Sequence, residues 1–130
     1  MFNHVVVGTN DLEKAKRFYD AVLGALGVAE GRSDHNERRR RYVYRTSTGT
    51  FYITQPIDGQ PATCANGGTI GFSCKSADEV MNWHAAGLAH GGVSVEDPPG
   101  RRGAAPGGVY LAYLRDPDGN KLCAVYRVPA

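Results

Sequence analysis

The chain has 130 residues, the size of one domain with room for its own hydrophobic core. Its formal net charge of +2, from 15 basic and 13 acidic residues, argues against a nucleic-acid or membrane partner. Three cysteines without C-x-x-C spacing argue against a disulfide framework or a zinc knuckle and favour a reducing, cytoplasmic setting. No signal peptide or membrane span of ~20 apolar residues is predicted.

The first elements along the chain are predicted to be a strand and an amphipathic helix. Residues 2–8 form a short β-branched run that contains His4. Asn10 and Glu13 have capping-box spacing, which predicts the start of a helix, and Gly27 predicts its end. The apolar positions of this helix share one face: Leu12, Ala15, Tyr19, Val22, Leu23 and Leu26.

Three strands are predicted after this helix, over residues 28–32, 39–47 and 50–55. The last two flank the turn Thr48-Gly49 and form a hairpin. Residues 56–68 are rich in proline and glycine and are interpreted as a linker.

The second half repeats this order about 65 residues later. A strand over residues 69–74 precedes a second capping box, Ser76 to Glu79, and a helix that ends at Gly91-Gly92. Strands follow near residues 93–96, 110–115 and 121–126. Between the first two of these, residues 97–108 are predicted to be a long loop, the place where substrate choice would be set.

The repeat predicts one α+β domain over residues 1–130, built of two β-α-β-β-β modules. Module 1 covers residues 1–55, the linker 56–68 and module 2 residues 69–130. One helix on one small sheet is too little for a stable fold, so the modules are expected to pair. The predicted arrangement is a curved mixed sheet with both helices on its outer face and a ligand cavity on its concave inner face.

Two segments and the module repeat carry a resemblance to a known family over nearly the whole chain. The segments are His4-Val5-Val6-Val7, followed by residues 10–20, and Arg115-Asp116-Pro117-Asp118-Gly119-Asn120-Lys121-Leu122. With them the chain resembles the vicinal oxygen chelate superfamily of glyoxalase, bleomycin-resistance and extradiol-dioxygenase-type proteins. The resemblance implies a divalent metal in the cavity, held by one residue from the first and one from the last strand of each module.

Mapped by motif, the four implied metal positions are His4 and Thr69 on the first strands, and Ile53 and Cys123 on the last strands. Only His4 has the family's usual ligand chemistry. Ile53 offers no donor atom, Thr69 offers a neutral hydroxyl, and Cys123 is a soft ligand only as thiolate. We therefore predict no standard metal site and no other cofactor. A divalent metal held by unmapped ligands is the alternative, with Gln55, Glu96 or His90 as examples.

Strand alternation places the candidate ligand-binding residues on one face. With His4 facing the cavity, Val5 and Val7 face the helix, and Cys123 likewise faces the cavity. Tyr113 is a further candidate, because hairpin aromatic residues can line a ligand cavity. His4 is interpreted as either a structural residue or a cavity acid–base group, and Cys123 as either a buried apolar residue or a reactive thiol.

The run Arg38 to Arg41, with Arg45 after it, is interpreted as a solvated edge. The alternative is that alternate arginines bind a carboxylate or phosphate at the cavity mouth.

The preferred function is binding of a small organic molecule without the standard metal site, in a resistance-type binding protein or an enzyme that uses His4 as an acid–base group. A metal-dependent lyase, isomerase or dioxygenase is the alternative. A sensing module of a larger assembly is a third alternative. The resemblance also implies a homodimer.

Overall fold

The computed structural model describes residues 1–104 and 107–129, so Ala105 and Pro106 of the predicted loop 97–108 lie outside the described residues. Module 1 contains β1 (His4–Gly8), α1 (Leu12–Gly24), β2 (Arg32–Ser33), β3 (Arg41–Thr46) and β4 (Gly49–Thr54). Module 2 contains β5 (Ile70–Ser73), α2 (Ala77–Ala89), β6 (Val93–Ser94), β7 (Gly100–Arg102), β8 (Val109–Arg115) and β9 (Lys121–Arg127). Neither helix of the described residues is long and apolar enough to cross a membrane.

The repeat of strand, helix and hairpin predicted from the sequence is confirmed. The four-stranded sheet of module 1 has the order β1-β4-β3-β2, and the five-stranded sheet of module 2 has the order β5-β9-β8-β6, with β7 also paired to β8. In each module the first strand runs parallel to the last and the hairpin is antiparallel. The fold class is therefore α+β, as predicted. The strand β7 lies in the segment predicted to be a loop.

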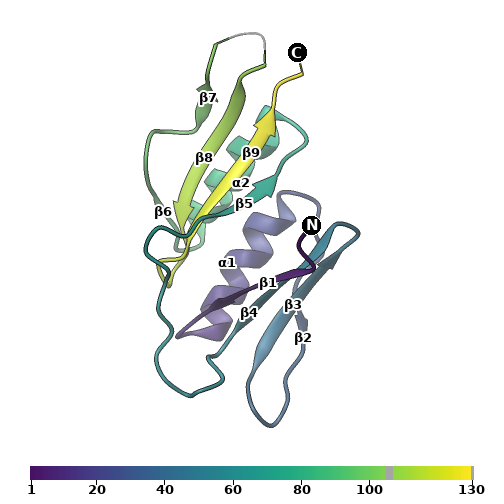
Figure 1. Ribbon diagram of the computed structural model, residues 1–130, viewed down its shortest axis with the longest axis vertical. Coiled ribbons are helices and arrows are strands. Elements are labelled where there is room, and N and C mark those ends of the chain that lie inside the picture. The colour runs from purple at the N-terminus through teal and green to yellow at the C-terminus, as the bar shows by residue number, and fades with distance from the viewer. Residues whose placement is uncertain (105–106, 130) are drawn as a thin grey trace.

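The two modules do not form one continuous sheet, which corrects the sequence-based prediction. Figure 1 shows them as two halves of an elongated molecule, with helix α1 near the middle. Among the described residues β1 and β5 each end their own sheet. Each sheet consequently has a helix face, which carries α1 or α2, and an opposite face that we call the open face.

A single hydrophobic core joins the two modules through their helices, which pack against each other. Its largest fully buried side chains include Phe18 and Tyr19 of α1 and Trp83 of α2. Strands of both sheets contribute to the same cluster, with Ile53 and Leu114 as examples. Burial of these apolar side chains is the main stabilising term for a domain of this size.

Helix α1 is capped by Asp11 and not by Asn10, so the capping box predicted from Asn10 to Glu13 is wrong. The Asp11 carboxylate accepts a hydrogen bond from the backbone N of Lys14 at 3.1 Å. The Asn10 side chain instead binds the linker, where its Nδ2 donates to the carbonyl of Ala62 and its Oδ1 accepts from the Ala62 backbone N. The helix ends at Gly24, three residues before Gly27.

The second capping prediction is confirmed. Ser76 Oγ accepts a hydrogen bond from the backbone N of Glu79 at 3.1 Å. The Glu79 carboxylate accepts in turn from the backbone N of Lys75, one residue before the cap. Helix α2 closes at His90, and Gly91 follows with φ +95°.

The turn between β8 and β9 is organised by the buried carboxylate of Asp116, which is 3% exposed. Its Oδ1 accepts hydrogen bonds from the backbone N of Asp118 and Asn120, both at 2.9 Å. Its Oδ2 accepts from the Tyr19 hydroxyl of α1 at 2.5 Å and from Asn120 Nδ2 at 2.8 Å. Burial raises the pKa of Asp116, although these four hydrogen bonds act to lower it.

The same turn of module 2 also holds the loop between β1 and α1 of module 1. Asp118 Oδ1 accepts a hydrogen bond from the backbone N of Asn10 at 2.8 Å. Asn120 Nδ2 donates to the carbonyl of Gly8 at 3.2 Å. Together with the Asp116–Tyr19 contact, these bonds fix module 1 to module 2.

Candidate functional site

The open face of the module 1 sheet carries a row of three polar side chains from neighbouring strands. His4 of β1 is the register partner of Thr50 of β4, and Thr50 is the partner of Arg45 of β3. Register partners project from the same face of a sheet, so these side chains lie side by side. Val5 and Val7 face the helix, as predicted.

Tyr52 lies at the centre of this open face. The Arg41 guanidinium is stacked over its ring, with 4.4 Å from Cζ to the ring centroid, and the His4 imidazole meets the ring edge-on at 5.8 Å. Arg41 is itself oriented by Asp34, whose Oδ2 accepts from its Nε at 2.8 Å and lies 2.7 Å from its Nη2. The aromatic ring is therefore held between two cationic or polar groups.

His4 is exposed, and its ring orientation is fixed by a neighbouring residue. Its Nδ1 lies 2.7 Å from Asn3 Oδ1. In the neutral ring this contact places the proton on Nδ1 and leaves Nε2 as an acceptor. The arrangement is suited to accepting a proton or a hydrogen bond from a molecule on the open face.

Ile53 does not lie on this face, which corrects the motif mapping. It is 0% exposed and belongs to the hydrophobic core on the helix face. Ile53 and Cys123 each lie four residues after the glycine of their hairpin turn, Gly49 and Gly119, and this common spacing is the reason for the mapping. In the first hairpin Gly49 is already the first residue of β4 and pairs with Thr46, whereas in the second hairpin Gly119 lies inside the loop before β9. The position in module 1 that corresponds to Cys123 is therefore Tyr52.

The open face of the module 2 sheet brings Cys123 and Tyr113 together. They are register partners on β9 and β8, and Cys123 also pairs with Gly71 of β5. Lys121 Nζ lies 5.1 Å from the centroid of the Tyr113 ring and forms an ion pair with Glu96. Thr69 is exposed and directly precedes β5.

The Cys123 thiol is 5% exposed and poorly suited to act as a thiolate. Burial raises the pKa of Cys123, although a hydrogen bond with Tyr113 acts to lower it. A thiol with a raised pKa is largely protonated near neutral pH and is a weak nucleophile and a weak metal ligand. Of the two interpretations of Cys123, this geometry favours the buried apolar residue.

Alkylation should distinguish the three cysteines. Cys64 is exposed, whereas burial raises the pKa of Cys74 to about 11 and that of Cys123 above its usual range. We expect iodoacetamide near neutral pH to modify Cys64 rapidly in the folded protein, and Cys74 and Cys123 only after unfolding. Intact mass spectrometry measures the number of modified thiols. Cys64→Ser should abolish the rapid step. Rapid modification of the Cys64→Ser protein would contradict this assignment.

A groove of about 820 Å³ is lined by residues of both edge strands, β1 and β5. Of the five candidate ligand-binding residues, only His4 lines it. Its walls include the open-face residues Thr50 and Arg45, and apolar residues of the core side such as Ile70 and Phe72. The structure thus separates the candidate residues: His4 lies on one open face, Tyr113 and Cys123 on the other, and Ile53 on neither.

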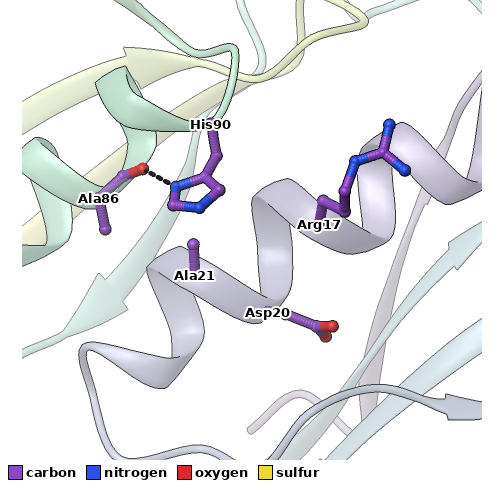
Figure 2. Close-up of a pocket in the computed structure, with 5 residues that line it drawn as sticks. All are labelled: Arg17, Asp20, Ala21, Ala86 and His90. Carbon is purple, nitrogen blue, oxygen red and sulfur yellow. Dashed lines mark hydrogen bonds between the residues drawn. The ribbon is translucent and has the colours of Figure 1, made fainter.

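The alternative metal ligands considered from the sequence also lie apart. Gln55 accepts a hydrogen bond from the backbone N of Arg40, and Glu96 is paired with Lys121. His90 lies in a separate pocket of about 560 Å³ between α1 and α2, where its Nδ1 lies 2.8 Å from the carbonyl oxygen of Ala86 (Figure 2).

The residues at the positions that the resemblance implies do not fit the usual metal. The set is an imidazole, a phenol, a neutral hydroxyl and a buried thiol, contributed by His4, Tyr52, Thr69 and Cys123. A catalytic zinc usually has three protein ligands, and magnesium and manganese prefer several carboxylate or carbonyl oxygens. No group of three or more His, Cys, Asp or Glu side chains able to hold a metal occurs within residues 1–104 and 107–129.

The arginine run divides between loop and sheet. Arg38 and Arg40 are exposed and precede β3. Arg41 and Arg45 belong to β3 and lie on the open face. Sequence reasoning missed Tyr52 and Thr50 on this face, although alternation from His4 through the parallel partner strand would have found them had the turn length been known.

Comparison with known proteins relates this fold to one family. A family model described as the Glyoxalase/Bleomycin resistance protein/Dioxygenase superfamily matches residues 1–124. The crystal structure of a glyoxalase/bleomycin resistance protein from Albidiferax ferrireducens T118 is 57% identical, with a TM-score of 0.89 over 98% of this chain and 99% of that chain.

Two more distant proteins share the fold. Virulence protein STM3117 of Salmonella typhimurium is 24% identical over 120 residues, which cover 92% of this chain and 79% of that protein. A lactoylglutathione lyase from Agrobacterium tumefaciens is 17% identical with a TM-score of 0.65, over 97% of this chain and 92% of that chain. The family model covers well over half of the sequence. The chain therefore belongs to the glyoxalase/bleomycin resistance protein/dioxygenase superfamily.

Proposed function

We propose that this protein binds a small organic molecule against the open faces of its sheets, without the metal site that its family resemblance implies. The observation that carries the proposal is the donor set, in which Tyr52, Thr69 and a buried Cys123 accompany the single imidazole of His4. An aromatic ring lies beside two of the polar groups, Tyr52 beside His4 and Tyr113 beside Cys123, and such combinations are typical of sites for small organic ligands. No other cofactor is part of the proposal.

His4 is the residue proposed to contact the ligand through a proton or a hydrogen bond. Its exposed ring is oriented by Asn3 and lies beside Tyr52. Such a group acts as a general base when a bound molecule places a proton within hydrogen-bond reach. The proposal therefore covers a binding protein and an enzyme that works through His4 alone.

Metal analysis tests the metal-free part of the proposal. Protein purified without an affinity tag or chelator should contain only substoichiometric divalent metal, because its donor set lacks the carboxylates and multiple imidazoles that hold one. Inductively coupled plasma mass spectrometry gives the metal content. Near-stoichiometric metal that is lost in His4→Ala would favour the alternative, a metal-dependent lyase, isomerase or dioxygenase. Asn3→Ala is the matched control, since it removes the orienting contact but no donor of the mapped set.

We further propose a homodimer that forms in the cytoplasm through the free edges of β1 and β5. An unpaired strand edge presents backbone donors and acceptors that pair readily with another strand. Phe2, which lines the groove and is 74% exposed, supports the same contact. Three free cysteines support the reducing compartment.

Sedimentation velocity tests the homodimer. We expect Phe2→Lys to raise the dimer dissociation constant about tenfold or more, because burying a phenylalanine contributes roughly 1.5–3 kcal/mol. Val93→Lys is the control, since Val93 is 61% exposed but lies on β6. A parent protein that is monomeric at high concentration, or equal effects of the two variants, would contradict this interface.

A further inference from the structure

The acidic residues are excluded from both sheets. The chain has 13 Asp and Glu residues, yet none occupies a strand position among the described residues. They lie on the helices, in the loops and in the turns. With acidic and basic residues nearly equal in number over the whole chain, this separation is a property of the sheets and not of the composition.

The basic residues of the strands lie on the open faces, with the exception of Arg101. In module 1, the Arg41 side chain is stacked over Tyr52, and Arg45 is the register partner of Thr50. Arg32 is the register partner of Val43, which is itself the partner of Tyr52. All three therefore share the face that carries His4.

Module 2 repeats this distribution on its own open face. Arg115 pairs with Lys121, and Lys121 lies over the Tyr113 ring. Arg102 and Arg127 are both partners of Val109. Within residues 1–104 and 107–129, the carboxylates that form ion pairs with basic residues of these faces are Asp34, paired with Arg41, and Glu96, paired with Lys121. A surface lined by one sign of charge concentrates ligands of the opposite sign.

Of the three arginines on the module 1 face, Arg32 and Arg45 form no ion pair within the described ranges, and Arg45 is the one that shares a row with His4. Arg41 is engaged by Asp34, but Arg45 is exposed and has no carboxylate within 4.0 Å in the part of the chain that the structure describes. Thr50 and His4 follow it in the same row across β4 and β1. Neighbouring strands are about 4.8 Å apart, so adjacent members of the row can contact one oxyanion group together.

We propose that the ligand of the open face is a small organic anion, whose carboxylate, sulfonate or phosphonate group is bound by the row Arg45, Thr50 and His4 while its apolar part contacts Tyr52. This inference rests on the proposed function and adds the chemical class of the ligand. An arginine supplies a charged fork for the oxyanion, the threonine hydroxyl donates one hydrogen bond, and the imidazole contributes another when protonated.

Two fluorescent probes of the same shape test the inference. Anilinonaphthalene sulfonate carries an anionic group, and N-phenylnaphthylamine has the same aromatic frame without it. We expect the parent protein to bind both probes, and to bind anilinonaphthalene sulfonate about tenfold more tightly than N-phenylnaphthylamine. A tenfold difference in affinity is what one additional charge-assisted hydrogen bond contributes. The preference should weaken as NaCl is added.

The variant Arg45→Gln should remove this preference and leave the affinity for N-phenylnaphthylamine unchanged. Arg17→Gln is the control, because Arg17 is an exposed arginine of α1 that lies in the pocket between the helices and on neither open face (Figure 2). Retained helical circular dichroism and an unchanged Tm exclude unfolding as the cause.

The outcomes separate the two proposals. The anion site is supported if Arg45→Gln loses the preference for anilinonaphthalene sulfonate and Arg17→Gln retains it. Equal affinity of the parent for both probes, or the same loss in Arg17→Gln, overturns the anion site and leaves the proposed function standing. A parent protein that binds neither probe overturns the proposed function together with the anion site.

Discussion

Replacing Asp116 with alanine is expected to lower the free energy of unfolding by about 4 kcal/mol. The carboxylate accepts four hydrogen bonds in a buried site, and each hydrogen bond to a charged group contributes roughly 1.5–3 kcal/mol. Loss of the acceptor also leaves the buried hydroxyl of Tyr19 without a partner. Urea denaturation followed by circular dichroism provides the free energy of the parent and the variant.

The control for this experiment is Asp97→Ala. Asp97 is exposed, and its carboxylate makes no recorded ion pair or hydrogen bond within the described ranges. We expect its substitution to change the free energy of unfolding by less than about 0.5 kcal/mol. Similar losses in both variants would show that Asp116 does not organise the turn.

The pH dependence of the Asp116→Ala effect follows from the direction of the pKa shift. Burial raises the pKa of Asp116 above its usual value of 3.8, so the folded protein binds this proton at higher pH than the unfolded chain does. The stability contributed by this shift is fully present below the unfolded pKa and is lost as the pH rises through the folded pKa. The difference between parent and variant should therefore be somewhat larger near pH 3.5 than at neutral pH.

Replacing Gly87 with alanine should destabilise the protein by about 1–3 kcal/mol, although alanine is the better helix former. A Cβ at this position of α2 would lie 2.2 Å from Leu114 Cδ1 and 3.3 Å from Val22 Cγ1. Leu114 and Val22 are both 0% exposed, so neither side chain has space to move away. Thermal unfolding should show a lower Tm.

Gly24→Ala is the matched control for Gly87. Gly24 is the last residue of α1, and a Cβ there would meet no atom within 4 Å. We expect an unchanged or slightly raised Tm, because alanine reduces the conformational entropy of the unfolded chain by an amount worth roughly 0.4–1 kcal/mol. A loss of stability at Gly24 equal to that at Gly87 would argue against close packing as the cause.

The sequence predicts the elements of this fold well because both modules carry local signals. Alternation in the strands and the Ser76 cap are short-range properties, and the structure confirms them. The choice of Asp11 over Asn10 as the cap of α1 depends on Ala62, fifty-two residues away in the linker. A local pattern has no information about such a partner.

The candidate site was harder to predict for two physical reasons. The equivalent strand position lies three residues after the turn glycine in the first hairpin and four in the second. Because a one-residue shift moves a side chain to the other face of its strand, the motif mapping selected Ile53 instead of Tyr52. The relative placement of the modules depends on helix packing and on long-range bonds such as Asp118 to Asn10. Periodicity therefore indicated two similar sheets without revealing that they remain separate.

The hydrogen bonds from the turn at Asp116 to α1 and β1 make the folding of each module depend on the other. Tyr19 is part of the core of module 1, yet its hydroxyl finds its acceptor only when the hairpin of module 2 has formed. Neither repeat is thus a complete folding unit, even though each has its own sheet. The two halves should unfold in one cooperative transition, and a chain cut within residues 56–68 should regain its structure only when both fragments are present.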